Sequence, residues 1–169
     1  TALPLLSPGD VLDIASGDGV LAELLAPHAH RYVCIDSSQR VVAAASERLR
    51  RFANVDVREG DMHALPFKDG SFDLVVLMHA LTYADKPAQA VAEAARVLRK
   101  GGRLLLSSLA KHEHRSAVEA YGHQNLGFSE KELRKFADKA GLTIASSETV
   151  TREKRPPHFE VISLIGIKP

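Results

Sequence analysis

The sequence contains one cysteine, Cys34, and no tryptophan among its 169 residues. A single cysteine excludes an internal disulfide, a dithiol redox motif and a multi-cysteine metal site, and it agrees with a reducing compartment. No apolar run approaches the ~20 residues that are needed to cross a bilayer. The first residues also lack the basic stretch of a secretory signal. We therefore expect a cytoplasmic protein without a membrane segment.

An excess of charge of one sign is also missing. The chain has 22 Lys and Arg against 21 Asp and Glu, so its formal net charge is +1. This near-neutrality gives no general electrostatic attraction to nucleic acids or to anionic membranes. With 45% hydrophobic and 25% charged residues the composition is globular, and the length suits one domain. We expect a single domain over residues 1–169, excised from a longer chain because it begins with Thr1 rather than Met.

Strand-like and helix-like segments alternate along the chain. Apolar runs are followed by segments whose apolar side chains recur at the 3.6-residue spacing of amphipathic helices. Such alternation predicts an α/β fold in which helices cover both faces of a mostly parallel sheet. The predicted strands are 10–14, 31–35, 55–58, 72–77 and 103–107, the predicted helices are 20–26, 38–52, 87–98 and 130–140, and an antiparallel hairpin of 142–150 and 158–167 closes the sheet.

Local signals place several ends of these elements. Pro27 is expected to end the first helix, and the pair Gly101–Gly102 to end the third. Ser129 and Glu132 have the spacing of a capping box. Residues 110–128 show no clear period, which is typical of a lid or a binding loop.

Three polar features follow predicted parallel strands, where open α/β sheets bind their ligands. The segment Asp13–Gly19 ends the first strand, and its glycines let the backbone approach a ligand closely. Asp36 ends the second strand, where a carboxylate can accept hydrogen bonds from a ribose diol. The segment Gly60–Met62 follows the third strand and places an apolar side chain beside a carboxylate, which suits a flat base with an exocyclic amine.

The acid in the first strand bears on which nucleoside the site prefers. The glycine spacing alone does not exclude a dinucleotide, since Ala22 follows Gly19 at the third position of the dinucleotide fingerprint. A carboxylate at Asp13, however, would repel a pyrophosphate and attract an ammonium group. We therefore favour a ligand that carries an amino-acid amine over a nicotinamide dinucleotide.

Four motifs in this order resemble those of the class I S-adenosylmethionine-dependent methyltransferases. They are residues 11–19, 34–36, 60–76 and 93–103, and the resemblance extends over about residues 8–109. It implies a Rossmann-like, doubly wound, mostly parallel seven-stranded sheet with an antiparallel C-terminal hairpin. It also implies S-adenosylmethionine as cofactor.

The same resemblance assigns roles to individual residues. Asp13 and the backbone of Ala15–Gly19 would hold the methionine part of the donor, and Asp36 both ribose hydroxyls. Asp61 would meet the adenine amine with Met62 packed on the ring, and His79 and Ala80 would lie near the sulfonium. The predicted cofactor-binding residues are Asp13, Ala15, Ser16, Gly17, Gly19, Asp36, Ser37, Asp61, Met62, His79 and Ala80.

Methyl transfer asks for alignment and exclusion of water, and for a general base when the acceptor is acidic. His79 and Tyr83, which follow the fourth predicted strand, are the candidates. The alternatives are a hydrogen-bonded structural histidine and a tyrosine packed under a lid. The three histidines His112, His114 and His123 are interpreted as a solvated segment, and no metal is predicted.

Some acceptors do not fit the residues. Enzymes that methylate the amino group of adenine carry an Asp/Asn-Pro-Pro-Tyr/Phe motif after the fourth strand, where this chain reads Met-His-Ala-Leu-Thr-Tyr over residues 78–83. Cytosine-C5 enzymes need a cysteine in a loop, whereas Cys34 lies within a predicted strand. Arsenite methylation needs several thiols.

The C-terminal part narrows the resemblance. Residues 121–129 and 155–160 are similar to the methyltransferase domain that some bacterial regulators carry behind an ArsR-type winged helix. This similarity implies an N-terminal DNA-binding domain in the full chain. Tyr121 and His123 would either line the acceptor pocket or pack within the lid. The domain itself is not expected to bind nucleic acid directly, and the basic tip at residues 152–155 is interpreted as solvated.

Two functions therefore remain in view. The first is an S-adenosylmethionine-dependent methyltransferase that acts on a small-molecule acceptor. The second is a non-catalytic sensor of S-adenosylmethionine or S-adenosylhomocysteine in a transcriptional regulator.

Overall fold

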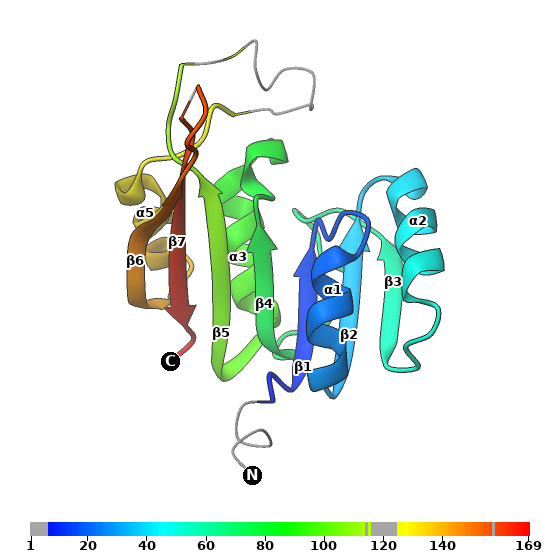
Figure 1. The fold of residues 1–169 in the computed structure, drawn as a ribbon. Helices are drawn as coiled ribbons and strands as arrows, with labels where there is room; N and C mark the ends of the chain where they lie inside the picture. The colour runs from blue at the N-terminus through cyan, green and yellow to red at the C-terminus, as the bar shows by residue number, and fades with distance from the viewer. Residues whose placement is uncertain (1–6, 114, 116–124, 157) are drawn as a thin grey trace.

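The computed structural model describes residues 7–113, 115, 125–156 and 158–169. These residues form a seven-stranded sheet in the order β3-β2-β1-β4-β5-β7-β6 (Figure 1). The five strands β1 to β5 are mutually parallel, and β7 runs antiparallel to β5 and β6. The doubly wound fold predicted from the sequence is confirmed. The strands are β1 Asp10–Ile14, β2 Arg31–Asp36, β3 Val55–Glu59, β4 Phe72–Met78, β5 Leu98–Leu109, β6 Thr143–Arg152 and β7 Glu160–Ile167.

Helices cover the two faces of this sheet (Figure 1). Ser38 caps α2, since its side chain accepts from Val41 N–H at 3.3 Å. Ser129 and Glu132 form the capping box of α5 that the sequence predicts. The α-helices are α1 Val20–Leu25, α2 Gln39–Leu49, α3 Pro87–Val97 and α5 Glu130–Lys139, and the 3-10 helices are η2 Ala26–His28 and η3 Leu81–Tyr83.

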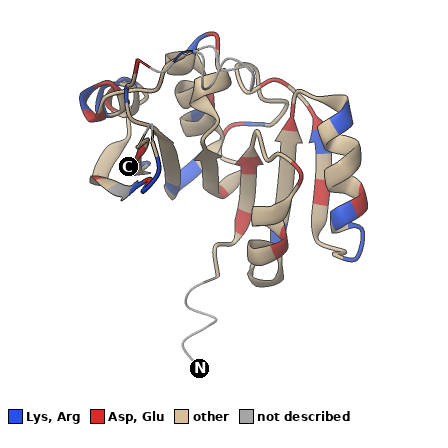
Figure 2. Ribbon diagram, turned by 45° about the horizontal axis from the view of Figure 1, so that its top comes forward, with Lys and Arg blue, Asp and Glu red and all other residues tan. Residues whose placement is uncertain are grey.

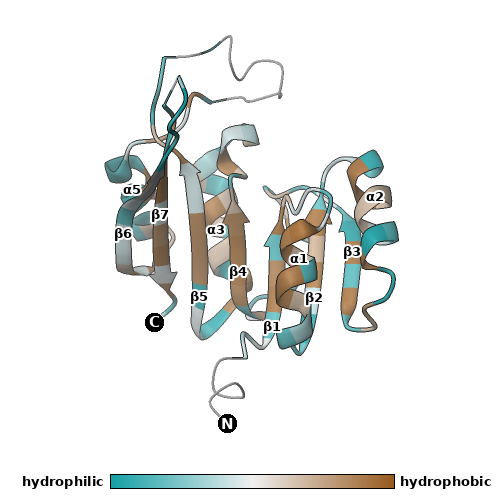
Figure 3. Ribbon diagram, in the orientation of Figure 1, coloured by the Kyte–Doolittle hydropathy of each residue, from teal (hydrophilic) through white to brown (hydrophobic). Residues whose placement is uncertain are grey.

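The sheet separates two hydrophobic cores. On one face Leu12 of β1 packs in a core with α3 and α5, and on the other Val11 packs with α1 and α2. A strand that is covered on both faces needs apolar residues at successive positions. This explains why β4 is hydrophobic along most of its length (Figure 3).

Two predicted boundaries differ from the structure. Helix α3 ends at Val97, and the pair Gly101–Gly102 lies inside β5. Leu98 already has an extended backbone (φ −72°, ψ 139°) and pairs with Phe72 of β4, so β5 begins five residues before the predicted strand. The α-helix α1 ends at Leu25, just before Pro27 as predicted, and Pro27 lies at the start of the 3-10 helix η2, where its missing N–H is not needed.

Charged residues of both signs occur together on α2 and α5 (Figure 2). None of the helices among the described residues is long and apolar enough to span a membrane. Of the residues singled out from the sequence, His114, Tyr121 and His123 lie outside the described part of the chain.

Candidate functional site

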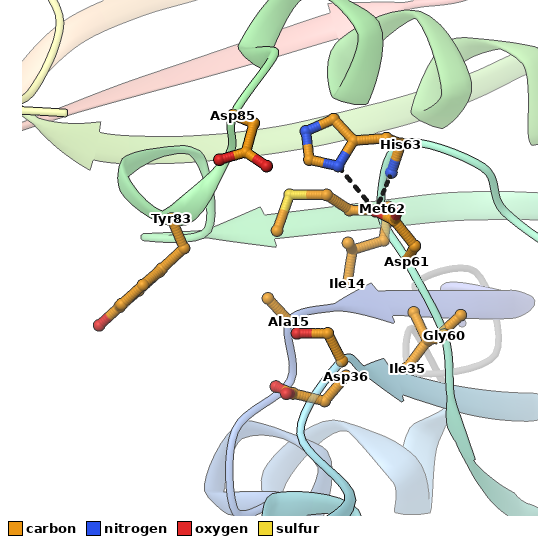
Figure 4. Close-up of a pocket in the computed structure, with 11 residues that line it drawn as sticks. Ile14, Ala15, Ile35, Asp36, Gly60, Asp61, Met62, His63, Tyr83 and Asp85 are labelled. Carbon is orange, nitrogen blue, oxygen red and sulfur yellow. Dashed lines mark hydrogen bonds and ion pairs between the residues drawn. The ribbon is translucent and has the colours of Figure 1, made fainter. Parts of the chain in front are cut away.

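The site lies at the carboxyl ends of β1, β2 and β4, where the strand order reverses direction across the sheet. Two adjoining cavities of about 550 Å³ and 240 Å³ open there. The larger is lined by Ala15, Gly17, Asp36, Ser37, Ser38, Val41, Met62, Met78, His79 and Tyr83. The smaller is lined by Ile14, Ala15, Ile35, Asp36, Ser37, Gly60, Asp61, Met62, His63, Tyr83 and Asp85 (Figure 4).

The turn after β1 forms one wall of the larger cavity. Gly17 has a positive φ of 60°, and a Cβ added there would meet nothing within 4 Å. The space beside this backbone is therefore open to a ligand. Gly19 serves packing instead, because a Cβ there would come within 2.9 Å of Leu49 on α2.

Asp36 joins this wall to the end of β2. One of its carboxylate oxygens accepts from Gly17 N–H at 3.2 Å, and the other accepts from Ser38 N–H at 3.0 Å. A carboxylate has about four acceptor positions, so both oxygens can still accept from a ligand. Because Asp36 lines both cavities, this carboxylate is held by backbone donors at the place predicted for a diol.

Asp13 lies behind the turn rather than in the cavity lining. Its side chain is 2% exposed, and it accepts a hydrogen bond of 2.8 Å from the hydroxyl of Tyr32. Burial raises the pKa of Asp13 to about 6, although the Tyr32 hydrogen bond acts in the opposite direction. Ser16 and Gly19 also stay outside the lining of both cavities, and Ser16 N–H donates to Ile35 O at 3.3 Å.

The turn after β3 forms the floor of the smaller cavity. Gly60 lets this turn pack closely on β2, because a Cβ there would collide with the end of the Ile35 side chain. Asp61 is 64% exposed, and hydrogen bonds from the backbone and ring of His63 lower its pKa. Met62 packs beside it against the core, as Figure 4 shows.

The segment after β4 supplies the two predicted catalytic candidates. His79 has a positive φ of 57°, and desolvation lowers the pKa of its ring, which favours a neutral imidazole. Tyr83 is 44% exposed and lines both cavities. Ala80 is 1% exposed and belongs to the core on the α3 face, so its side chain does not reach either cavity.

Among the lining residues that the sequence analysis does not predict, His63 and Asp85 are the ionisable ones. Both are brought to the site by the approach of the α3 N-terminus to the turn after β3. His63 had a local signal, since it follows Asp61 by two residues, but Asp85 had none.

The charge of the site has one sign. The ionisable side chains that line the cavities are the three carboxylates of Asp36, Asp61 and Asp85, together with two histidines and a tyrosine, and no Lys or Arg is among the lining residues described. Such a site attracts a cation and repels a diphosphate. Among the described residues there is also no group of three His, Cys, Asp or Glu side chains that could hold a metal ion.

Comparison with known proteins places this geometry in a family. A family model described as a methyltransferase domain matches residues 12–106, more than half of the chain. The chain belongs to this family. The match runs from β1 into β5 and therefore includes every strand end that contributes to the cavities.

Relatives and solved structures agree with this assignment. The chain is 43% identical over 104 residues to an uncharacterised 37.1 kDa protein in transposon TN4556 of Streptomyces fradiae, a match that covers 59% of this chain and 30% of that protein. It is 38% identical over 99 residues to a probable S-adenosylmethionine-dependent methyltransferase of Mycolicibacterium smegmatis, which covers 59% and 37% of the two chains. The matches thus span about a third of these relatives.

The fold is shared with the N-methyltransferase NodS of Bradyrhizobium japonicum, whose structure was solved in complex with S-adenosylhomocysteine. The TM-score is 0.78 at 21% identity, over 99% of this chain and 83% of that one. At this identity the likeness concerns the fold alone.

Proposed function

We propose that the chain binds S-adenosylmethionine and transfers its methyl group to a small-molecule acceptor. The observation that carries this proposal is the acidic cavity around Asp36, whose carboxylate is held by two backbone N–H groups beside the open space at Gly17. The ligand has a sulfonium and an ammonium group, which a lining with three carboxylates and no described Lys or Arg favours, whereas NAD has a diphosphate, which such a lining opposes.

The residues present fit this donor. Asp36 would accept from the two ribose hydroxyls, since its oxygens keep free acceptor positions. Gly17 leaves room for the methionine part of the donor. For the adenine base, Asp61 offers a hydrogen-bond acceptor and Met62 an apolar surface beside it. Asp13 would act through the turn that it supports, because its side chain is buried behind that turn.

The donor, when bound, supplies an already activated methyl group. What remains for the protein is to orient the acceptor and to exclude water. His79 stands at the larger cavity with a lowered pKa, so its neutral ring could take a proton from an acidic acceptor. Tyr83 lines the same cavity and would contact the acceptor.

Calorimetric titration with S-adenosylmethionine, S-adenosylhomocysteine and NAD tests the donor site. We expect the two adenosyl ligands to bind and NAD not to bind. Asp36→Ala should weaken adenosyl binding by about 100-fold or more, because hydrogen bonds to a charged group are lost. Asp56→Ala is the matched control, since Asp56 pairs with Arg58 on β3 and lines neither cavity. Unchanged affinity in Asp36→Ala would contradict the placement of the ribose.

A second candidate is a regulatory sensor that binds the same ligands without turnover. The resemblance of residues 121–129 and 155–160 to the domains fused to ArsR-type winged helices supports it. In that case residues 1–169 are one domain of a longer cytoplasmic regulator, with a DNA-binding domain as partner. Tight binding of S-adenosylhomocysteine without methylation of any member of a broad acceptor panel would favour the sensor. Methylation that is lost in Asp36→Ala would favour the enzyme.

A further inference from the structure

A histidine that neither the sequence motifs nor the family match assigns lies against the carboxylate of Asp61. The Nδ1 atom of His63 is 2.7 Å from Oδ1 of Asp61, and the backbone N–H of His63 donates to the same oxygen at 2.8 Å. Both described contacts use Oδ1. The second oxygen, Oδ2, is therefore available to accept from a ligand in the smaller cavity, which both residues line.

The structure also determines which ring nitrogen of His63 carries the proton. The backbone N–H of Lys86 donates to Nε2 at 3.1 Å. A backbone N–H can only donate, so Nε2 is the acceptor and Nδ1 carries the hydrogen. The contact between Nδ1 and Asp61 is therefore a hydrogen bond that the neutral ring donates to a carboxylate.

The ring is anchored from the opposite side of the site. Lys86 is the N-cap residue of α3, and the side chain of Gln89 on the same helix donates to the backbone carbonyl of His63 at 2.8 Å. The His63 side chain is only 17% exposed, whereas that of Asp61 is 64% exposed. The exposed carboxylate is thus held by two donors of His63, its backbone N–H and its half-buried ring, and helix α3 holds this ring in turn.

We propose that His63 is a positioning residue that orients Asp61 so that the site selects a base with an exocyclic amine. This proposal rests on the proposed function, because it needs an adenosyl ligand in the smaller cavity. An adenine amine donates to Oδ2 of the oriented carboxylate. A hypoxanthine presents a carbonyl oxygen at the same place, so two acceptors would face each other and the deaminated ligand would bind weakly.

Two substitutions of His63 separate this role from a purely structural one. In His63→Asn the amide nitrogen takes the place of Nδ1 and can donate to Asp61. In His63→Gln the amide takes the place of Nε2 and can accept from Lys86 N–H, but the donor to Asp61 is lost. Each variant keeps one of the two hydrogen bonds, so a structural role would make their effects alike.

The measurement is the ratio of dissociation constants for S-adenosylhomocysteine and its deaminated, hypoxanthine-containing counterpart. We expect the preference for the adenine ligand to persist in His63→Asn and to fall by about tenfold or more in His63→Gln, as expected for the loss of a hydrogen bond to a charged group. His30→Gln is the matched control, since His30 makes an equivalent 2.8 Å contact with Asp10 at the other end of β1, away from the cavities.

The outcomes distinguish the two proposals. A wild-type chain that binds neither ligand overturns the proposed function and this proposal with it. A wild-type chain that binds S-adenosylhomocysteine, together with equal preferences in His63→Asn and His63→Gln, overturns the role of His63 alone. Unfolding midpoints of both variants verify that the binding data come from folded protein.

Discussion

The hydroxyl of Tyr32 donates to a carboxylate oxygen of Asp13 at 2.8 Å, inside the sheet between β1 and β2. Both side chains are buried, so this hydrogen bond stabilises a charge that water cannot reach. The pKa of Asp13 is nevertheless raised from 3.8 to about 6, because burial outweighs the single donor. The ionisation of Asp13 therefore affects both stability and the geometry of the turn that follows it.

Asp13→Asn should change how stability depends on pH. The folded-state pKa of Asp13 lies above its unfolded value, so its contribution is fully present below pH 3.8 and is lost as the pH rises through about 6. The free energy of unfolding of the wild type should fall relative to Asp13→Asn by about 2 kcal/mol between pH 4 and pH 8. Urea unfolding of both proteins across this range measures the difference, and parallel curves would contradict the raised pKa.

Tyr32→Phe should destabilise the chain more at pH 8 than at pH 5. The substitution removes the donor to Asp13, and an unpaired buried carboxylate costs about 1–3 kcal/mol, more than the protonated acid does. The control is Tyr32→Phe in the Asp13→Asn background, where the loss of stability caused by Tyr32→Phe should no longer depend on pH. A pH-independent effect in both backgrounds would show that Tyr32 acts by packing alone.

Gly17→Ala should abolish donor binding at a small cost in stability. The backbone at residue 17 has a positive φ of 60°, and an added Cβ would meet no atom within 4 Å. The cost in stability is therefore the backbone strain alone, about 1–2 kcal/mol. The methyl group enters the space proposed for the ligand. Gly101→Ala is the matched control, because Gly101 has a φ of 81° and equally open surroundings at the other end of the sheet. Chemical unfolding should show similar losses of stability in the two variants. Calorimetry should show a loss of donor binding in Gly17→Ala alone.

Ala15→Gly should not destabilise the chain, although glycine usually does. Ala15 lies in the left-handed region at φ 55°, which costs a residue with a Cβ about 1–2 kcal/mol. The greater freedom of glycine in the unfolded state costs about 0.4–1 kcal/mol, so the net gain should be below about 2 kcal/mol. Ala22→Gly, at a buried position of α1, should destabilise by contrast. A loss of stability in Ala15→Gly that equals the loss in Ala22→Gly would contradict the strain.

Ser129→Ala should lower the free energy of unfolding by about 1 kcal/mol and leave donor binding unchanged. The substitution removes the acceptor of Glu132 N–H at 3.1 Å and so opens the capping box of α5. Helix α5 contributes no residue to either cavity. Thermal unfolding and calorimetry on the same protein test both statements, and weakened binding would indicate that α5 communicates with the site.

Local chemistry was enough to predict the parts of the site that follow strands. The positions of Asp36, Gly17 and Met62 in the cavities agree with the rule that ligands bind at the carboxyl ends of parallel strands. The roles of the predicted site residues remain predictions, since binding has to test them. The capping box of α5 can also be predicted from the sequence, because Ser129 and Glu132 lie three residues apart.

Contacts between distant segments could not be predicted in this way. At the early start of β5, Leu98 pairs with Phe72, and the guanidinium of Arg99 contacts Asp10 and Asp73 from 89 and 26 residues away. The pair Gly101–Gly102 is typical of a helix end, and the nearby sequence does not indicate that it lies within β5. Likewise His63 gains its orientation from the backbone of Lys86, 23 residues later, which no pattern near His63 indicates.

The place of β7 between β5 and β6 has a consequence for folding during synthesis. Strand β6 leaves the ribosome before β7, yet β7 is its hydrogen-bonded neighbour in the part of the sheet that the structure describes. Until β7 emerges, β6 can dock only through α5, and the outer side of β5 is an unpaired edge. The nascent chain therefore carries an incomplete sheet with an exposed edge until β7 inserts, and this half of the domain should become resistant to proteases only after β7 has been released.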